Sequence, residues 1–368
     1  MTGREATGRG TTGRLRRVAV IFTGGTISMR VDPLAGGNVP ALSGADILAR
    51  TPGLDAIAAV EPIDLGRTPA SHFTFDGLFE IADTIRSAQA DPAIDGVVLV
   101  QGTDVIEETA FFWDLVLSGE APVVVTGAMR SASEPDDDGP ANLRDAVRCA
   151  VDPQLRGEGV VVVLAGSIDA ADDVTKTHAA ALDTFRSLND GPLGRVGPDG
   201  VLVSRRRGPR RHVAATSAAA QVRLITAHVA MDGSLLDAAV SAGSDGLVIE
   251  ATGAGNTTGS LLDAAIRAMD KGIPVVLTTR CAAGAAGAGY AFRGGGATWV
   301  RAGAMLAGTL TGPKARIALA LGLGAGLGRD ELAALLAGPG AVRVTTAGAV
   351  AGVALAGPPA GSSGGGPA

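Results

Sequence analysis

Four stretches of this sequence carry threonine hydroxyls, and three of them also carry a carboxylate or an amine. They are "TGGTI" (residues 23–27), "QGTDVIEET" (101–109), "TGAMRSASEPDDDGP" (126–140) and "DVTKT" (173–177). A hydroxyl nucleophile needs a proton acceptor, a group that holds the acceptor in place, and donors for the oxyanion that develops on the substrate. Threonine, aspartate and lysine side chains in these stretches therefore suit acyl transfer, provided that the fold brings them together.

The elements that must position these side chains are strands, because each stretch follows an apolar run bounded by Gly, Pro or Asp. The alternation of such runs with amphipathic segments predicts β-α units and a mainly parallel sheet. The predicted strands are 18–22, 96–101, 122–126, 159–165, 222–228, 246–250 and 273–279. The predicted helices are 77–87, 107–118, 142–151, 260–269, 314–323 and 330–336. Ligands of open α/β sheets bind at the carboxyl ends of the strands, where these polar stretches lie.

With 368 residues, the chain is long enough for two α/β domains. The composition changes at residues 204–221, "SRRRGPRRHVAATSAAAQ". This segment lacks the alternation of a β-strand, and five arginines cluster in it. Such a cluster is typical of a solvated charge run, so we predict exposed arginines here. The predicted organisation is a disordered extension (1–16), a catalytic α/β domain (17–204), a linker (205–221), a second α/β domain (222–357) and a disordered tail (358–368).

Composition argues against several classes of protein. The formal net charge is −6, and no basic block is interleaved with aromatic residues, which argues against a nucleic-acid or membrane-surface partner. The two cysteines, Cys149 and Cys281, are far apart, which fits a reducing compartment. The apolar run after the basic N-terminus is shorter than the roughly 7–15 residues of a signal-peptide core. We therefore expect a cytoplasmic protein.

The order of the motifs along the chain resembles that of the bacterial-type L-asparaginase/glutaminase family, whose members are threonine-nucleophile amidohydrolases. The stretches that carry the resemblance are "TGGTI" (23–27), "GTDVIEET" (102–109), "TGAMR" (126–130), "DGP" (138–140), "DVTKT" (173–177), "GPLG" (191–194) and "GAGN" (253–256). The resemblance implies two α/β domains, each a mainly parallel sheet with flanking helices. It also implies hydrolysis of L-asparagine to L-aspartate and ammonia through an acyl-enzyme, without a metal or another cofactor.

Carried onto matching positions, the resemblance implies a role for each site residue. Thr26 corresponds to the nucleophile, and the other implied catalytic residues are Thr103, Asp104 and Lys176. The implied substrate-binding residues are Ser71, His72, Thr103, Asp104, Ala128 and Asn256. Asp104 would hold the substrate's α-ammonium and Ser71 its α-carboxylate. Asn256 resembles an asparagine that the neighbouring subunit contributes, so the implied assembly is a homo-oligomer, a dimer of intimate dimers.

The lysine of "DVTKT" stands out because only three of the 31 basic residues are lysines: Lys176, Lys271 and Lys314. A lysine can lose its proton at a buried site, whereas an arginine stays charged. Among its departures from the family, the loop after the nucleophile, residues 28–43, contains no tyrosine. Two candidate acceptors for the Thr26 proton then remain: a water molecule, or Lys176 acting through Thr103.

Other functions fit the sequence less well. The segment 246–265 combines a strand, a Gly-x-Gly turn and a helix, but its glycines are one residue off the dinucleotide-binding fingerprint. The four histidines are scattered without paired spacing, which argues against a metal hydrolase. A glutaminase-asparaginase of mixed specificity, an amidotransferase subunit that releases ammonia for tRNA amidation, and a non-enzymatic amino-acid binder all remain open.

Overall fold

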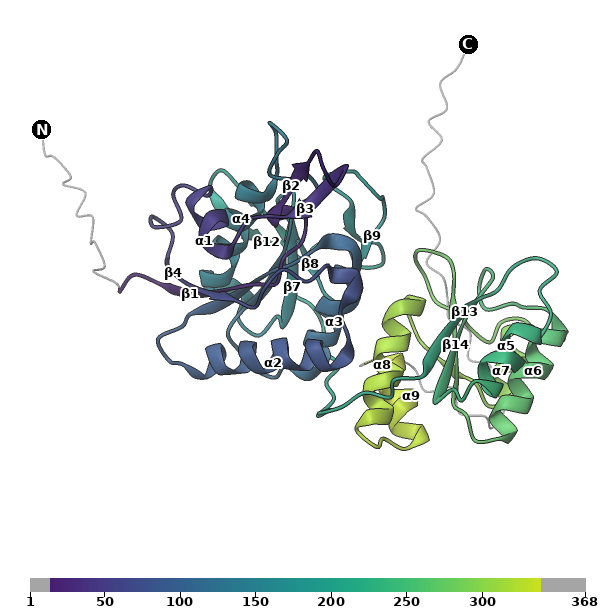
Figure 1. The fold of residues 1–368 in the computed structure, drawn as a ribbon. Helices are drawn as coiled ribbons and strands as arrows, with labels where there is room; N and C mark the ends of the chain where they lie inside the picture. Colours follow the sequence, from purple (N-terminus) through teal and green to yellow (C-terminus); the bar gives the residue numbers. More distant parts are fainter. Residues whose placement is uncertain (1–13, 339–368) are drawn as a thin grey trace, which may run out of the picture.

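The first domain of the computed structural model, which describes residues 14–338, is built on an eight-stranded sheet with the order β12-β11-β8-β7-β6-β5-β1-β4 (Figure 1). The strands from β7 to β4 are parallel, and β8, β11 and β12 are antiparallel. The sheet strands are β1 (Arg17–Phe22), β4 (Ala59–Asp64), β5 (Gly96–Val100), β6 (Val123–Thr126), β7 (Val160–Leu164), β8 (Ser167–Ala170), β11 (Gly194–Gly197) and β12 (Gly200–Val203). The helices are α1 (Gly44–Ala49), α2 (Phe75–Ala90), α3 (Ile106–Val116) and α4 (Gly139–Val151).

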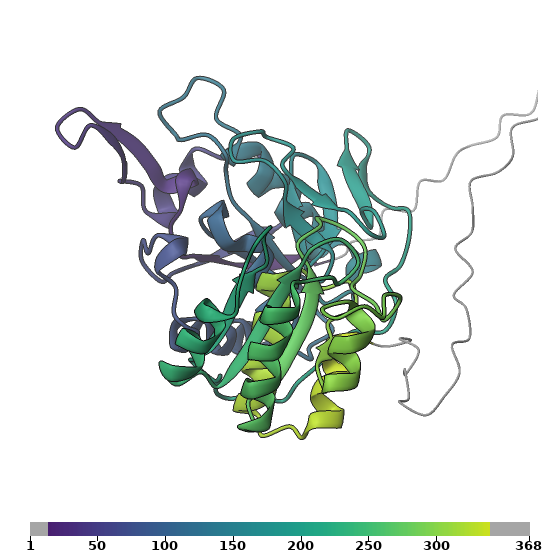
Figure 2. The ribbon, with the colours of Figure 1, turned by 90° about the vertical axis from the view of Figure 1, so that its right-hand side faces the viewer.

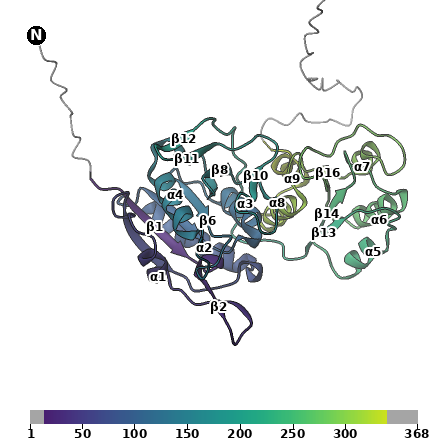
Figure 3. The same ribbon diagram turned by 90° about the horizontal axis from the view of Figure 1, so that it is seen from above.

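Two small hairpins complete this domain. They are β2 (Met29–Asp32) with β3 (Gly37–Pro40), and β9 (Val174–Lys176) with β10 (Phe185–Ser187). The β2–β3 hairpin projects from the body of the domain beyond the sheet (Figure 3). It corresponds to the segment that follows the predicted nucleophile.

Helices cover both faces of the first sheet, which explains why its strands are apolar throughout. Along β1, Ala19 and Ile21 pack in one core with α2 and α3, whereas Val18, Val20 and Phe22 pack in another with α1 and α4. Because successive side chains point to opposite faces, a strand buried on both sides needs an unbroken apolar run. That run is the signal that predicted β1 from the sequence.

The second domain is a four-stranded parallel sheet with helices on both faces (Figure 2). Its strands are β13 (Val222–Thr226), β14 (Gly246–Ala251), β15 (Val275–Thr279) and β16 (Met305–Leu306). Its helices are α5 (Ser234–Ser241), α6 (Gly259–Asp270), α7 (Gly296–Ala302), α8 (Gly312–Gly324) and α9 (Arg329–Ala337). Within the described residues, no helix is both long and apolar enough to cross a membrane.

Helix α8 lies at the junction of the two domains, between α3 and the second sheet (Figure 1). One apolar core contains Phe111 and Phe112 of α3, Leu319 of α8 and Val248 of β14, all fully buried. The domains therefore share a hydrophobic core, so burial of apolar surface stabilises their mutual position as well as each domain.

The two-domain α/β fold predicted from the sequence is confirmed. Every predicted strand and helix coincides with an observed element, and the ends differ by up to three residues. The elements that the sequence did not predict are mostly short; α1 and α7, for example, have six and seven residues. Strand β4 was not predicted because it contains Pro62. Residues 1–13, within the predicted extension, and the predicted tail (358–368) lie outside the described residues.

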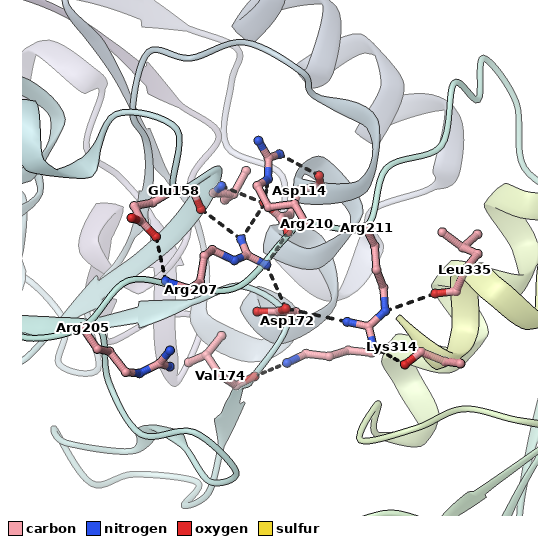
Figure 4. A network of polar contacts seen from close by, with 12 residues as sticks. Asp114, Glu158, Asp172, Val174, Arg205, Arg207, Arg210, Arg211, Lys314 and Leu335 are labelled. Carbon is pink, nitrogen blue, oxygen red and sulfur yellow. Dashed lines mark hydrogen bonds and ion pairs between the residues drawn. The ribbon is translucent and has the colours of Figure 1, made fainter. Parts of the chain in front are cut away.

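The prediction of exposed arginines in the segment 205–221 is wrong for four of the five, since only Arg206 is exposed. The side chain of Arg207 is only 6% exposed and forms a two-pronged ion pair with Asp114 of α3, both N···O distances being 3.0 Å. It also pairs with Asp172 at 2.8 Å, and Arg210 contacts Asp114 at 3.1 Å (Figure 4). Asp114 and Asp172 of the first domain thus receive their counter-ions from the joining segment.

The third buried arginine, Arg211, connects the joining segment to the second domain. Its guanidinium lies 3.7 Å from Asp172 and donates a hydrogen bond of 3.1 Å to the carbonyl oxygen of Leu335 in α9 (Figure 4). Burial raises the pKa of Asp172, but Arg207 and Arg211 outweigh burial and hold it below its ordinary value. This network is a polar counterpart to the apolar core shared by the two domains.

Candidate active site

The candidate site lies where the carboxyl ends of β1 and β5 meet. In the sheet order, the chain runs from β1 to its neighbour β4 on one side and from β5 to its neighbour β6 on the other, so the connections after β1 and β5 leave in opposite directions. Such a switch in strand order is where open α/β sheets bind ligands. Thr23 closes the end of β1 against β5, because both its N–H and its hydroxyl donate to the carbonyl oxygen of Val100, at 3.0 and 3.1 Å.

The "TGGTI" and "QGTD" loops touch through their backbones. A Cβ atom on Gly25 would lie 2.2 Å from the nitrogen of Gly102, and the φ angle of Gly25 is +94°. Only glycine combines that backbone angle with so close an approach. Thr26 and Thr103, which each follow one of these glycines, are therefore carried by loops in direct van der Waals contact.

Lys176 of β9 reaches the second of these loops. Its Nζ donates a hydrogen bond of 2.9 Å to the Oγ1 of Thr103, a residue that is 4% exposed. The same Nζ lies 3.8 Å from the Oδ1 of Asp104, whose side chain is 67% exposed against 15% for that of Lys176. The structure thus brings together three of the predicted catalytic residues, with the lysine partly buried and the carboxylate facing solvent.

Strand β9 is held beside this site by a carboxylate of α3. Glu107 accepts a hydrogen bond of 3.2 Å from the backbone N–H of Lys176. On its other edge, β9 pairs in antiparallel register with β10, with Lys176 opposite Phe185. Glu107 lies in the "GTDVIEET" stretch, but sequence reasoning did not assign it a role.

The remaining predicted residues of the first domain line the same loops. Thr26 begins a short 3-10 turn, Thr26–Ser28, and is partly exposed. Ser71 and His72 are exposed in the turn Ala70–His72. The side chain of Ala70 lies 3.0 Å from where a Cβ on Gly102 would stand, so this turn adjoins the Thr103 loop.

The loop after β6 contributes Ala128, which is fully buried. Its neighbour Gly127 packs against Thr103, since a Cβ on Gly127 would lie 3.1 Å from the Cγ2 of Thr103. The loop is held in shape by Asp138, which accepts hydrogen bonds from the backbone N–H groups of Met129 and Arg130. A bulkier residue at position 127 would therefore clash with the carbonyl oxygen of Gln101, 2.5 Å from the new Cβ, and also press on Thr103.

Asn256 lies apart from these residues, in a tight turn of the second domain that an isolated bridge closes to Thr252. Its Oδ1 is buried without a hydrogen-bond partner, and within residues 14–338 no hydrogen bond or ion pair joins Asn256 to the first domain. Tyr290, the chain's single tyrosine, is 49% exposed in the second domain and packs beside Phe292.

In the described part of the chain, no group of three His, Cys, Asp or Glu residues is placed to hold a metal ion.

Comparison with known proteins agrees with this geometry. The family model for the N-terminal asparaginase domain matches residues 17–209, and the model for the glutaminase/asparaginase C-terminal domain matches residues 221–336. The chain belongs to the asparaginase family. The family resemblance inferred from the motifs is thus confirmed over both domains.

Individual members of the asparaginase family are similar over most of their length. A probable L-asparaginase of Deinococcus radiodurans is 40% identical over 325 residues, which is 86% of this chain and 96% of that protein. An L-asparaginase of Bacillus licheniformis is 32% identical, covering 83% and 95% respectively. The crystal structure of a probable cytoplasmic L-asparaginase from Campylobacter jejuni superposes with a TM-score of 0.78 at 26% identity, covering 87% of this chain and 99% of that chain.

Proposed function

We propose that the chain hydrolyses the side-chain amide of L-asparagine to L-aspartate and ammonia, through an ester on Thr26. The observation that carries this proposal is the hydrogen bond of 2.9 Å between Lys176 Nζ and Thr103 Oγ1, beside the loop of Thr26. A partly buried amine hydrogen-bonded to a hydroxyl is an arrangement suited to moving a proton. Membership of the asparaginase family supports the amide as substrate.

In the proposed first step, the Thr26 Oγ attacks the amide carbon and its proton passes through Thr103 to Lys176. The proton then reaches the amide nitrogen, the C–N bond breaks, and ammonia leaves. In the second step, water attacks the ester, aspartate is released and the Thr26 hydroxyl regains its proton. The route requires Thr26 and Thr103 on adjacent loops, which the contact of Gly25 with Gly102 supports.

Binding of the amino-acid part of the substrate falls to charged and polar groups at the rim of the site. We assign the α-ammonium to the exposed carboxylate of Asp104 and the α-carboxylate to Ser71, with His72 and Ala128 as further contacts. Backbone N–H groups of the two glycine-rich loops are suited to stabilise the oxyanion, because such turns at strand ends leave donors unpaired.

We further propose a homo-oligomer in which Asn256 of one subunit completes the site of its neighbour. Asn256 makes no described polar contact with its own first domain, while Tyr290 and Phe292 expose about half of their surface in the same domain. Gly294, which accepts a hydrogen bond from the residue after Asn256, connects that turn to these aromatic residues. Exposed aromatic residues at this position fit a subunit interface. A dimer of intimate dimers is the assembly that we expect.

We also propose a cellular location and limits for the two functional units. We place the protein in the cytoplasm, which the widely separated cysteines and the similar Campylobacter jejuni structure support. We also propose functional units at residues 17–204 and 222–357, joined by residues 205–221.

The direct test is the release of ammonia from L-asparagine and from L-glutamine by the purified chain alone, measured side by side. We expect L-asparagine to be hydrolysed without any partner. Comparable rates on the two amides would indicate a mixed glutaminase-asparaginase. Binding of either amide without ammonia release would contradict the proposal.

The same assay addresses the amidotransferase alternative. A glutamyl-tRNA(Gln) amidotransferase component from Methanothermobacter thermautotrophicus is 30% identical over 275 residues, which is 72% of this chain and 62% of that protein. Ammonia release that requires a partner protein and tRNA would support such a role for this chain. Release by the chain alone would exclude it.

The glycine contact between the two loops gives a sharp prediction. Gly25→Ala places a Cβ 2.2 Å from the Gly102 nitrogen, so the loops must separate. A shift of about 1 Å costs about 100-fold in rate, so we expect at least that loss in asparagine hydrolysis. The matched control is Gly53→Ala, where φ is +85° but nothing lies within 4 Å of the new Cβ. Equal activities of the two folded variants would contradict the proposed contact.

A further inference from the structure

Lys314 is a fully buried lysine that the proposed mechanism does not use. It is 1% exposed and lies in the first turn of α8, in the second domain. Its Nζ donates a hydrogen bond of 2.6 Å to the backbone carbonyl oxygen of Val174, the first residue of β9 in the first domain (Figure 4). The contact therefore crosses the domain junction and ends two residues before Lys176.

This position is costly for a lysine for two reasons. Burial disfavours the charged form and lowers the pKa of Lys314 to about 8, although Glu107, Asp172 and Asp173 oppose that shift. A positive charge in the first turn of a helix is also unfavourable, because the helix dipole is positive at that end. In the described residues the ammonium forms no ion pair with a carboxylate, so its closest compensation is the hydrogen bond to the Val174 carbonyl oxygen.

A buried lysine at position 314 is explained if its contact is needed to fix the position of the β9 backbone. The backbone of this three-residue strand is held at two points by side chains from other elements: Lys314 holds the carbonyl of Val174, and Glu107 holds the N–H of Lys176. In an extended strand, two residues span about 7 Å, so a shift at Val174 is passed on to the Lys176 backbone with little loss. The Nζ of Lys176 must in turn meet the Thr103 hydroxyl at 2.9 Å.

We propose that Lys314 is a positioning residue for the reaction: from the second domain, it holds β9 so that the Lys176 amine meets the Thr103 hydroxyl. This inference rests on the proposed function, since it requires Lys176 to move the proton. It makes the chemistry of the first domain depend on the docking of α8 from the second.

The test is Lys314→Met, which keeps a long side chain but removes the donor. We expect kcat for L-asparagine to fall about 30- to 100-fold while KM changes less than about threefold, because β9 shifts whereas Asp104 and Ser71 stay in place. The matched control is Lys271→Met, an exposed lysine at the end of α6, which should keep the wild-type kcat. Thermal unfolding and circular dichroism report whether each variant is folded.

A double-mutant cycle separates positioning from a general structural role. If Lys314 acts through Lys176, then Lys314→Met should cost less than about threefold in kcat when Lys176 is already methionine. Losses that multiply, or a folded Lys314→Met with wild-type kcat, would overturn the inference. Full activity of Lys176→Met would contradict the proposed function first, and that outcome is distinguishable because it does not involve position 314.

A second variant covers the case in which Lys314→Met does not fold. Lys314→Gln keeps a polar group in the junction but is too short to reach the Val174 carbonyl, so the same kcat loss and the same non-additivity with Lys176→Met are expected. Hydrogen exchange of the peptide that contains residues 174–176 should be faster in this variant than in wild type. Unchanged exchange together with unchanged kcat would overturn the inference.

Discussion

Thr26→Ala is expected to abolish hydrolysis of L-asparagine while leaving the fold intact. Removal of a nucleophile eliminates the covalent route, and losses of about 10⁴-fold or more in kcat are typical. The substitution should not disturb packing, because Thr26 is partly exposed and its side chain donates no described hydrogen bond. Ammonia release under saturating L-asparagine measures the effect, and retained binding of L-aspartate shows that the site is intact.

Two companion variants define what a loss in Thr26→Ala means. Thr26→Ser keeps a hydroxyl and should retain a measurable part of the activity. Thr84→Ala removes the hydroxyl of a threonine on α2, where it donates to the carbonyl of Glu80, and should leave kcat within about twofold, because the proposed site does not use this hydroxyl. More than about one hundredth of the wild-type rate in folded Thr26→Ala would exclude Thr26 as the nucleophile.

Lys176→Arg is expected to reduce kcat by about 10³-fold, within the range that general acid–base groups contribute. Arginine keeps the positive charge and hydrogen-bonding capacity beside Thr103 and Asp104, but its guanidinium remains protonated and cannot accept a proton. The variant therefore isolates proton transfer from electrostatic attraction. Steady-state kinetics with L-asparagine over a range of pH, interpreted together with thermal unfolding, measure the loss.

The same variant decides between the two routes for the Thr26 proton. A large loss of kcat in Lys176→Arg favours transfer through Thr103 to Lys176. Near wild-type turnover would point to a water molecule as the acceptor instead. Lys271→Arg is the matched control, because that lysine is exposed and distant in sequence from the strand ends of the site.

The sequence predicts the catalytic loops well because they are local features. The strand before "TGGTI" is apolar on both faces, and the glycines that follow it permit a turn that no other residue could make. By contrast, β4 is interrupted by Pro62, whose missing N–H is tolerated because this strand lies at the edge of the sheet. An apolar run that a proline interrupts in the sequence can thus still form a regular edge strand in the fold.

Long-range pairing accounts for what the sequence did not predict. The arginines of the joining segment look like a solvated cluster, since their partners Asp114 and Asp172 are 93 and 35 positions away from Arg207. The scarcity of lysine drew attention to Lys314 as one of three lysines. Nothing in the sequence near it indicated that it would contact Val174. Periodicity identifies buried faces and leaves the partner of a buried charge undetermined.

The arginine network also bears on the order in which the protein can fold. Asp114, whose side chain is 1% exposed, acquires its counter-ions from Arg207 and Arg210, which follow the last strand of the first sheet. During synthesis, a first domain that ends at residue 203 would have to bury that carboxylate without a counter-ion, with the Val160 N–H as a remaining donor, which costs several kcal/mol. The nascent domain should therefore complete its packing only after the joining segment has left the ribosome, just ahead of the second sheet.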